Sequence, residues 1–110
     1  MRNFILCTAG ALYGVPKGIN TCAIGSLGMY PFEDNKKEFF EKLSETISMS
    51  LGKEFYIETP FMGMHKHEVI KRYGKFIPLE LSLTCINPVN GEPCGKCIKC
   101  KEREEALSLL

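Results

Sequence analysis

Residues 84–100 read TCINPVNGEPCGKCIKC and contain four of the six cysteines of this 110-residue chain. Their spacing is C-x8-C-x2-C-x2-C, so the last three thiols follow one another at steps of three residues. Such thiols can converge on one point if the backbone turns tightly, and Gly95 permits a tight turn. The segment from Asn87 to Pro93 is rich in turn-forming residues and can bring Cys85 back to the other three. The spacing therefore predicts one compact group of four sulfur atoms.

Four thiolates bound to one ion at about 2.3 Å form the closed tetrahedral site of structural zinc. We expect such a site to stabilise the fold rather than to catalyse a reaction, because it leaves no coordination position for water. Zinc binding to small peptides contributes on the order of 10 kcal/mol or more, so the last third of the chain is predicted to depend on the ion. The expected ligands are Cys85, Cys94, Cys97 and Cys100.

Two other uses of these cysteines remain open. Disulfide bonds would make thiols three residues apart compete for the same partners. An iron–sulfur cluster also uses C-x2-C-x2-C steps, but the fourth cysteine here lies upstream and no Cys-Pro pair follows the motif. Zinc is the favoured interpretation, and it implies a reducing cytoplasm rather than export. The remaining two cysteines, Cys7 and Cys22, lie in apolar segments and are predicted to pack in the core.

The composition excludes several classes of protein. The chain is 45% hydrophobic and 25% charged with a formal net charge of +1, which is typical of one globular domain or part of one. This charge gives no argument for nucleic-acid or membrane partners, and no apolar run approaches the ~20 residues of a membrane span. The N-terminal segment MRNFILCTAGALYGV has one positive charge and no clean small-x-small cleavage motif, so we interpret it as a buried helix rather than a signal peptide.

Hydrophobic periodicity and turn residues predict alternating helices and strands. Alternation of this kind favours right-handed βαβ crossovers and therefore an α/β fold with a parallel, Rossmann-like sheet and flanking helices. We expect a C-terminal zinc-binding segment to follow this sheet. The expected elements are helix 4–13, strand 19–24, a helix ending at residue 51, strand 54–59, helix 65–73, an extended segment 77–84 and helix 99–109.

Two helices carry more detailed predictions. Asn3 is expected to cap the first helix, whose inward face would carry Phe4, Ile5, Ala9 and Leu12. Asn35 and Glu38 have the spacing of a capping box for the long helix, with Asp34 as a second candidate cap. The apolar stripe of that helix comprises Phe39, Phe40, Leu43, Ile47 and Leu51, and Gly52 should end it.

Three further positions are candidates for binding. The loop from Gly25 to Asp34 follows a strand, at the edge of an open α/β sheet where ligands bind, although it lacks a phosphate-binding glycine motif. Lys66 begins a helix and could reach an anion there, the alternative being a solvated lysine. His65 and His67 are two residues apart and would point to opposite sides of a helix, so we expect cap or surface histidines rather than metal ligands.

Short motifs in the expected order resemble the 7-cyano-7-deazaguanine synthase family. Arg-Asn opens the first helix, a strand ends in Ile-Gly, and D-x-x-x-E-F leads into the long helix. K-x-E-V and S-x-x-C…CGKCxxC follow, and the cysteine tail is the most specific of these motifs. The resemblance covers nearly the whole chain and is to the C-terminal half of the family. It implies an adenine-nucleotide alpha-hydrolase fold of the N-type ATP pyrophosphatase (PP-loop) superfamily, with residues 1–84 as half of that domain and residues 85–110 as the zinc-binding segment.

The resemblance also implies an activity, a compartment and site residues. Family members are cytoplasmic ligases of queuosine or archaeosine biosynthesis, and so serve tRNA modification. They use ATP and Mg²⁺ to adenylate 7-carboxy-7-deazaguanine, form the amide with ammonia and dehydrate it to the nitrile. Their zinc is structural. The positions that match the family's zinc ligands are Cys85, Cys94, Cys97 and Cys100. Those that match its substrate-side residues are Arg2, Asn3, Asp34, Glu38 and Lys66, and no catalytic residue is assigned.

The chain departs from the family pattern in two places. The SGG-x-DS pyrophosphate loop has no counterpart in these 110 residues, and backbone contacts of that kind are central to the chemistry. We therefore expect a chain that is inactive alone, as a fragment, half of a split enzyme or a truncated descendant. Its partner would be the missing ATP-binding half or a second copy. The loop from Gly25 to Asp34 is shorter than usual and lacks its Asp-Tyr, and Lys36 replaces a frequent Arg, so the carboxylate substrate could differ.

A second hypothesis is a small zinc-stabilised module that binds RNA or a protein. RNA contact would use the basic residues near the cysteines, and interspersed glutamates dilute this patch. We therefore regard nucleic acid as the less favoured partner. The basic residues are Lys96, Lys99, Lys101 and Arg103.

Overall fold

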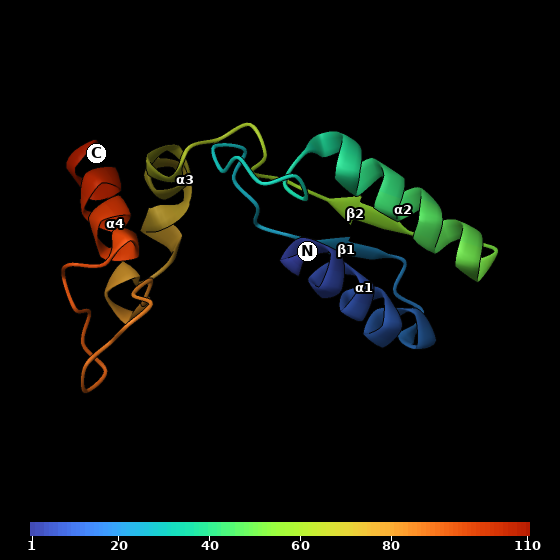
Figure 1. Cartoon of the computed structure of the whole chain (residues 1–110), viewed down its shortest axis with the longest axis horizontal. Helices are drawn as coiled ribbons and strands as arrows, with labels where there is room; N and C mark the ends of the chain where they lie inside the picture. Colours follow the sequence, from blue (N-terminus) through green and yellow to red (C-terminus); the bar gives the residue numbers. More distant parts are fainter. The chain divides into compact units, whose positions relative to one another are not determined.

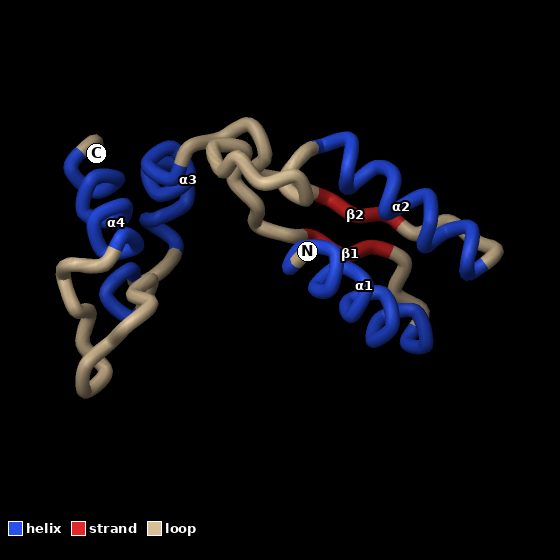
Figure 2. The backbone as a smooth tube through the Cα atoms, viewed as in Figure 1, coloured by secondary structure: helices blue, strands red, loops and turns tan.

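Two short strands, β1 (Thr21–Ala23) and β2 (Tyr56–Glu58), pair in parallel in the computed structural model, which describes residues 1–110. Helix α2 (Lys37–Leu51) lies in the connection between them, as a parallel pair requires (Figure 2). The α/β class and the parallel pairing are therefore confirmed. The strand expected over residues 19–24 is shorter and keeps only the centre of that range.

The first unit, residues 1–64, has helices on one face of this sheet. Cys22 lies opposite Ile57 in the register, so their side chains share a face, and both pack against the core of α1 (Arg2–Gly14) and α2. The other face carries Tyr56, which is 49% exposed, and Glu58, which is also exposed. One side of the sheet is therefore uncovered in this chain. The buried core residues are Cys7, Ala11, Phe40, Leu43, Ile47 and Phe55.

Helix α2 follows the predicted apolar stripe, but its capping differs from the prediction. Phe40, Leu43 and Ile47 are buried, whereas Leu51, which was also expected in the stripe, is 37% exposed in the last turn. Gly52 ends the helix with a φ of 67°, the left-handed conformation that favours glycine. Lys36 is the N-cap residue and its side chain makes no cap hydrogen bond. The capping box predicted from Asn35 is wrong, because the Asn35 amide is buried within the preceding loop and bonds to that loop instead.

Helix α1 buries a different face from the predicted one. Its buried residues are small, namely Cys7, Ala11 and Gly14, whereas Ile5 is 60% exposed and Leu12 is 74% exposed. Small side chains allow the helix backbone to approach β1 closely: a Cβ on Gly10 would lie 3.6 Å from Cys22 Cβ. The expected buried face carries the bulkiest apolar residues of the helix. The face that is buried carries the small residues instead, because they allow closer packing. Asn3 also proves to lie within the helix, which Met1 caps.

The second unit, residues 65–110, contains α3 (Lys66–Tyr73) and α4 (Ile98–Ser108) (Figure 1). His65 is the N-cap residue of α3, one of the two places expected for it, and its backbone N–H donates to Glu68 Oε2 at 2.6 Å. The His65 and His67 rings stack with centroids 5.8 Å apart, so the expectation that they point to opposite sides of a helix is wrong, because the N-cap backbone is extended. The segment predicted to be extended instead forms a 3₁₀ turn at Leu79–Leu81. Arg103 of α4 stabilises this turn by donating to the Leu79 carbonyl at 2.7 Å.

Hydrophobic burial is sparse in this second unit. Outside the cysteine cluster, Ala106 is its one buried residue, while Phe76 is 73% exposed and Leu81 is 81% exposed. Polar contacts and the cysteine segment must therefore supply much of what holds the unit together. The predicted functional boundary after residue 84 stays a prediction. No helix of the chain combines the length and the apolar character needed to cross a membrane.

The buried stripe of α2 gives a prediction about stability. Replacing Phe40, which is 2% exposed, by alanine should lower the free energy of unfolding by about 3–5 kcal/mol, because truncation leaves a cavity. Met49 lies on the same helix but is 83% exposed, so Met49→Ala should change it by less than about 0.5 kcal/mol. Urea unfolding, monitored by circular dichroism, measures the free energy of unfolding of both variants. An equally small change in Phe40→Ala and Met49→Ala would contradict the placement of Phe40 in the core.

Candidate functional site

The four cysteines of the C-terminal segment converge as their spacing predicts. The sulfur atoms of Cys85, Cys94, Cys97 and Cys100 all lie within 4.8 Å of one another. Cys97 Sγ is 3.5 Å from Cys100 Sγ and 3.9 Å from Cys85 Sγ. A tetrahedral ion with bonds of about 2.3 Å places its ligand sulfurs about 3.8 Å apart, so the cluster has the size of a metal site. A disulfide needs about 2.05 Å, and all six cysteines of the chain are free thiols.

Local backbone geometry produces this convergence. Asn90 and Gly91 both have positive φ, 51° and 80°, and form a two-residue turn across which Val89 and Glu92 exchange two backbone hydrogen bonds of 2.9 Å. The hairpin returns the chain so that the Cys94 N–H donates to Cys85 Sγ at 3.3 Å. Gly95 follows with a φ of 71°, which supplies the tight turn expected from the sequence.

The start of α4 places the last two sulfur atoms. Cys97 is the N-cap residue of α4, and its sulfur accepts a hydrogen bond from the Cys100 N–H at 3.4 Å. The Cys97 N–H in turn donates to Cys94 Sγ at 3.4 Å. Backbone N–H groups thus surround the sulfurs and favour their thiolate forms. Helix α4 therefore begins inside the cysteine cluster, so its first turn and the cluster depend on one another.

The pKa values of the thiols reflect these contacts. Backbone N–H groups of Ile86 and Cys100 donate to Cys97 and lower the pKa of its thiol to about 6. Hydrogen bonds from the backbone of Lys96 and Cys97 lower the pKa of Cys94. Burial, followed by the hydrogen bond with Cys97, raises the pKa of Cys100 to about 12. Four adjacent thiolates repel one another, and a divalent cation would remove that repulsion. The donor set therefore fits a thiophilic metal ion.

The cationic side chains near the cluster are partly committed to contacts within the protein. Lys99 Nζ lies 2.9 Å from Glu102 Oε2, and Arg103 donates to Ser82 Oγ at 2.9 Å as well as to the Leu79 turn. Two of the four basic residues of the RNA hypothesis therefore have structural partners. These contacts do not test that hypothesis.

Two of the predicted substrate-side residues meet at the start of α1. The Asn3 backbone N–H donates to Asp34 Oδ2 at 3.0 Å, and the Asn3 side-chain amide donates to the Asp34 carbonyl at 2.7 Å. The amino group of Met1 also lies 3.0 Å from Asp34 Oδ2. Its hydrogen bond, together with that of the Asn3 N–H, lowers the pKa of the Asp34 carboxyl. Both contacts use Oδ2 and tie the loop that ends at Asp34 to the start of α1.

The other predicted substrate-side residues have separate surroundings. Arg2 is exposed at the first position of α1. Glu38 is exposed in the first turn of α2 and pairs with Lys42 at 3.0 Å, an ordinary i,i+4 helix pair. Lys66 begins α3 and pairs with Glu102 of α4 at 3.0 Å. The roles of these residues in binding remain predictions.

Sequence reasoning missed the function of Asn35 in the loop before α2. Asn35 is 5% exposed, and its amide donates to the carbonyls of Leu27 and Tyr30 at 2.7 and 2.9 Å. Its oxygen accepts a hydrogen bond from Ser26 Oγ. Close packing also requires Gly28, because a Cβ there would lie 1.9 Å from the Met62 carbonyl oxygen. A capping box and a loop-bridging asparagine have the same sequence pattern, so no signal in the sequence separates them.

The two cysteines outside the cluster pack in the first unit as predicted. Cys7 is 2% exposed, and its thiol is hydrogen-bonded to that of Cys22, which is half-buried. Burial, with Cys22 as a smaller contribution, raises the pKa of Cys7 to about 11. A thiol with so high a pKa is a poor nucleophile at neutral pH.

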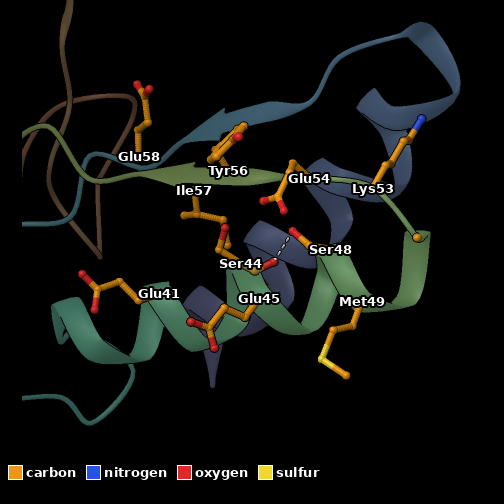
Figure 3. A pocket seen from close by; sticks show the side chains of 11 residues that line it. Glu41, Ser44, Glu45, Ser48, Met49, Lys53, Glu54, Tyr56, Ile57 and Glu58 are labelled. Atoms are coloured by element: carbon orange, nitrogen blue, oxygen red, sulfur yellow. Dashed lines mark hydrogen bonds between the residues drawn. The ribbon is translucent and has the colours of Figure 1, made fainter.

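A groove of about 840 Å³ between α2 and β2 contains none of the predicted site residues. Ser44 and Ser48 project from α2 toward β2, where Ile57 faces them (Figure 3). The two hydroxyls donate to the Phe55 carbonyl at 2.5 and 3.1 Å, and Ser48 Oγ also accepts from the Phe55 N–H at 2.9 Å. The serines therefore bind the backbone next to the strand, which indicates a structural function for this groove.

Comparison with known proteins gives the family of the chain. The family model described as queuosine biosynthesis protein QueC matches residues 1–110. A 7-cyano-7-deazaguanine synthase of Desulfitobacterium hafniense is 32% identical over 109 residues, covering 98% of this chain and 48% of the relative. The enzyme of Phocaeicola vulgatus is 32% identical over 114 residues, and that of Clostridium botulinum is 31% identical over 112 residues. These two alignments cover 96% and 94% of this chain and 50% of each relative.

The chain is an α/β protein in which the sheet is followed along the sequence by a four-cysteine cluster that could hold a metal ion. Within that class, the chain belongs to the queuosine biosynthesis protein QueC family, whose relatives named above are 7-cyano-7-deazaguanine synthases. The resemblance found in the sequence motifs is thereby confirmed. The chain spans about half the length of the curated relatives it matches.

The geometry of the cluster predicts its response to mutation and to metal removal. Elemental analysis should find about one thiophilic metal ion per chain. Cys97→Ser should weaken metal affinity by more than the roughly 10- to 100-fold that loss of an outer-shell partner costs. Chelation should accelerate hydrogen exchange in α4, because Cys97 and Cys100 hold its first turn.

The matched control is Cys22→Ser, which changes a thiol outside the cluster. This variant should retain the full metal content. A purified chain without stoichiometric metal, or equal metal loss in both variants, would contradict the assignment of the cluster as a metal centre.

Proposed function

We propose that this chain is the substrate-side, metal-binding half of a 7-cyano-7-deazaguanine synthase. The observation that carries the proposal is the family match over residues 1–110, which ends in the four-cysteine cluster. The reaction of the complete enzyme would convert 7-carboxy-7-deazaguanine and ammonia to the nitrile at the expense of ATP, in the cytoplasm, on the route to modified tRNA. This proposal includes the finer fold assignment, a partial adenine-nucleotide alpha-hydrolase-like sheet.

The cysteine centre would hold a structural zinc ion. Thiolates are soft ligands that suit zinc, and a four-thiolate site has no open position for a substrate. Zinc would stabilise the turn from Cys94 to Cys100 and the start of α4. The chain's own contribution is the set of backbone N–H groups that surround the sulfurs.

The residues at the start of α1 suit the purine part of the substrate. A guanine-like base presents adjacent N–H donors on one edge, and a carboxylate oxygen accepts such donors well. Asp34 carries such a carboxylate beside the start of α1, where the Asn3 N–H donates to its Oδ2. The carboxylate of the substrate would need a cationic partner, for which Arg2 and Lys66 are the two separate candidates.

ATP and Mg²⁺ would be bound by a partner that carries the pyrophosphate loop. Its proposed identity is the ATP-binding half of the enzyme or, failing that, a second copy of the chain. Three features support a partner: the relatives are about twice as long, one face of the sheet is uncovered, and α1 exposes Leu12 and Tyr13 at 74% and 69%. An exposed apolar face of this kind is typical of an interaction surface.

Ligand binding tests the substrate-side assignment. The metal-loaded chain should bind 7-carboxy-7-deazaguanine in isothermal titration calorimetry, and Asp34→Asn should weaken binding by about tenfold or more, because it removes a charged acceptor. Glu33→Gln is the matched control, since Glu33 is 90% exposed and pairs only with Lys36, and it should not change the affinity. Absence of binding by the unmodified chain, or equal affinities of the two variants, would contradict the assignment.

A further inference from the structure

Glu102 links the two helices of the second unit through a shared carboxylate. Its Oε2 lies 3.0 Å from Lys66 Nζ at the start of α3 and 2.9 Å from Lys99 Nζ on its own helix. The side chains of Lys66 and Glu102 are only 19% and 21% exposed. This pair is therefore better shielded from solvent than an exposed surface pair, which contributes little.

The position of Lys66 favours such a partner. The start of a helix carries a partial positive charge, so a lysine ammonium at the first position of α3 is electrostatically unfavourable. Glu68 in the same turn directs Oε2 to the His65 N–H rather than to Lys66. The anion that compensates Lys66 therefore comes from α4. Because an ammonium has three donors, contact with Glu102 leaves others for a second anion.

The location of Glu102 ties this pair to the cysteine centre. Cys97 caps α4 and Cys100 lies in its first turn, so Glu102 stands within the next turn of the same short helix. Besides the hydrogen bonds of Arg103 to Ser82 and Leu79, few contacts fix α4, since it buries little beyond Cys100 and Ala106. Loss of the ion should therefore release the start of α4 and, with it, the carboxylate that holds Lys66.

We propose that Glu102 is a positioning residue that holds the Lys66 ammonium in place, and that the metal centre sets the position of Glu102 through α4. The part that concerns substrate rests on the proposed function, in which Lys66 binds the carboxylate of the deazapurine. The cysteine centre would then take no part in the reaction itself, but it would control the position of Lys66, which binds an anion. By linkage, metal and anionic substrate each raise the affinity of the chain for the other by the same factor.

The first experiment measures Lys66 directly and needs no substrate. The metal-loaded full chain is labelled with N-hydroxysuccinimidyl acetate, and the rate of acetylation of each lysine is followed by mass spectrometry. Lys66 should react about tenfold more slowly than Lys37, whose side chain is 80% exposed. Glu102→Gln should abolish this protection, and so should removal of the metal with a chelator.

A matched variant controls for general effects on the helix. Glu105→Gln changes an exposed glutamate one turn further along α4 and should leave Lys66 protected. Unchanged protection in Glu102→Gln would overturn the positioning role of Glu102. Unchanged protection after chelation would overturn the link from the metal centre to Lys66.

The second experiment asks whether Glu102 acts through Lys66 on substrate binding. In calorimetry with 7-carboxy-7-deazaguanine, Glu102→Gln should weaken binding about fivefold or more, whereas it should have no further effect in a Lys66→Met background. Independent, additive losses would overturn the positioning role. If the unmodified chain binds no deazapurine, the proposed function fails, and the labelling result still decides whether Glu102 and the metal centre hold Lys66.

Discussion

Four sulfur atoms within 4.8 Å of one another dominate the second half of the molecule, because residues 65–110 bury little else. Apolar burial contributes about 25 cal/mol per Å², and a unit whose buried residue is one alanine gains little from it. A structural metal contributes on the order of 10 kcal/mol in small peptides, which is comparable to the stability of a whole domain. The turn at Asn90 and Gly91, the positive φ of Gly95 and the Cys97 cap all serve to bring the sulfurs together.

The first unit depends on a different kind of constraint, the close approach of helix and strand. Cys7, Ala11 and Gly14 let α1 lie near β1, and Phe40 and Phe55 fill the space between α2 and the sheet. The long side chains of α1 are left on its outer surface. A helix that is apolar on both sides is typical of an element buried on both sides, which agrees with a larger assembly around this half.

The sequence predicted the parallel pairing, most of the stripe of α2 and the convergence of the cysteines, because each follows from local spacing. It predicted the wrong face of α1, since periodicity identifies apolar residues but not which of two apolar faces packs more closely. It also misassigned Asn35, whose amide satisfies loop carbonyls that no pattern reveals. The ion pair between Lys66 and Glu102 joins residues 36 positions apart and could not be foreseen without coordinates.

The hydroxyl groups of Ser44 and Ser48 influence which edge of the small sheet can accept a further strand. They form hydrogen bonds with the N–H and the carbonyl of Phe55, at the free edge of the sheet next to β2. On that edge, the peptide groups of Ile57 are the next ones that could pair with another strand. The outward peptide groups of Thr21 and Ala23 on β1 have no such cover. A strand contributed from elsewhere would therefore pair more readily beside β1 than beside β2.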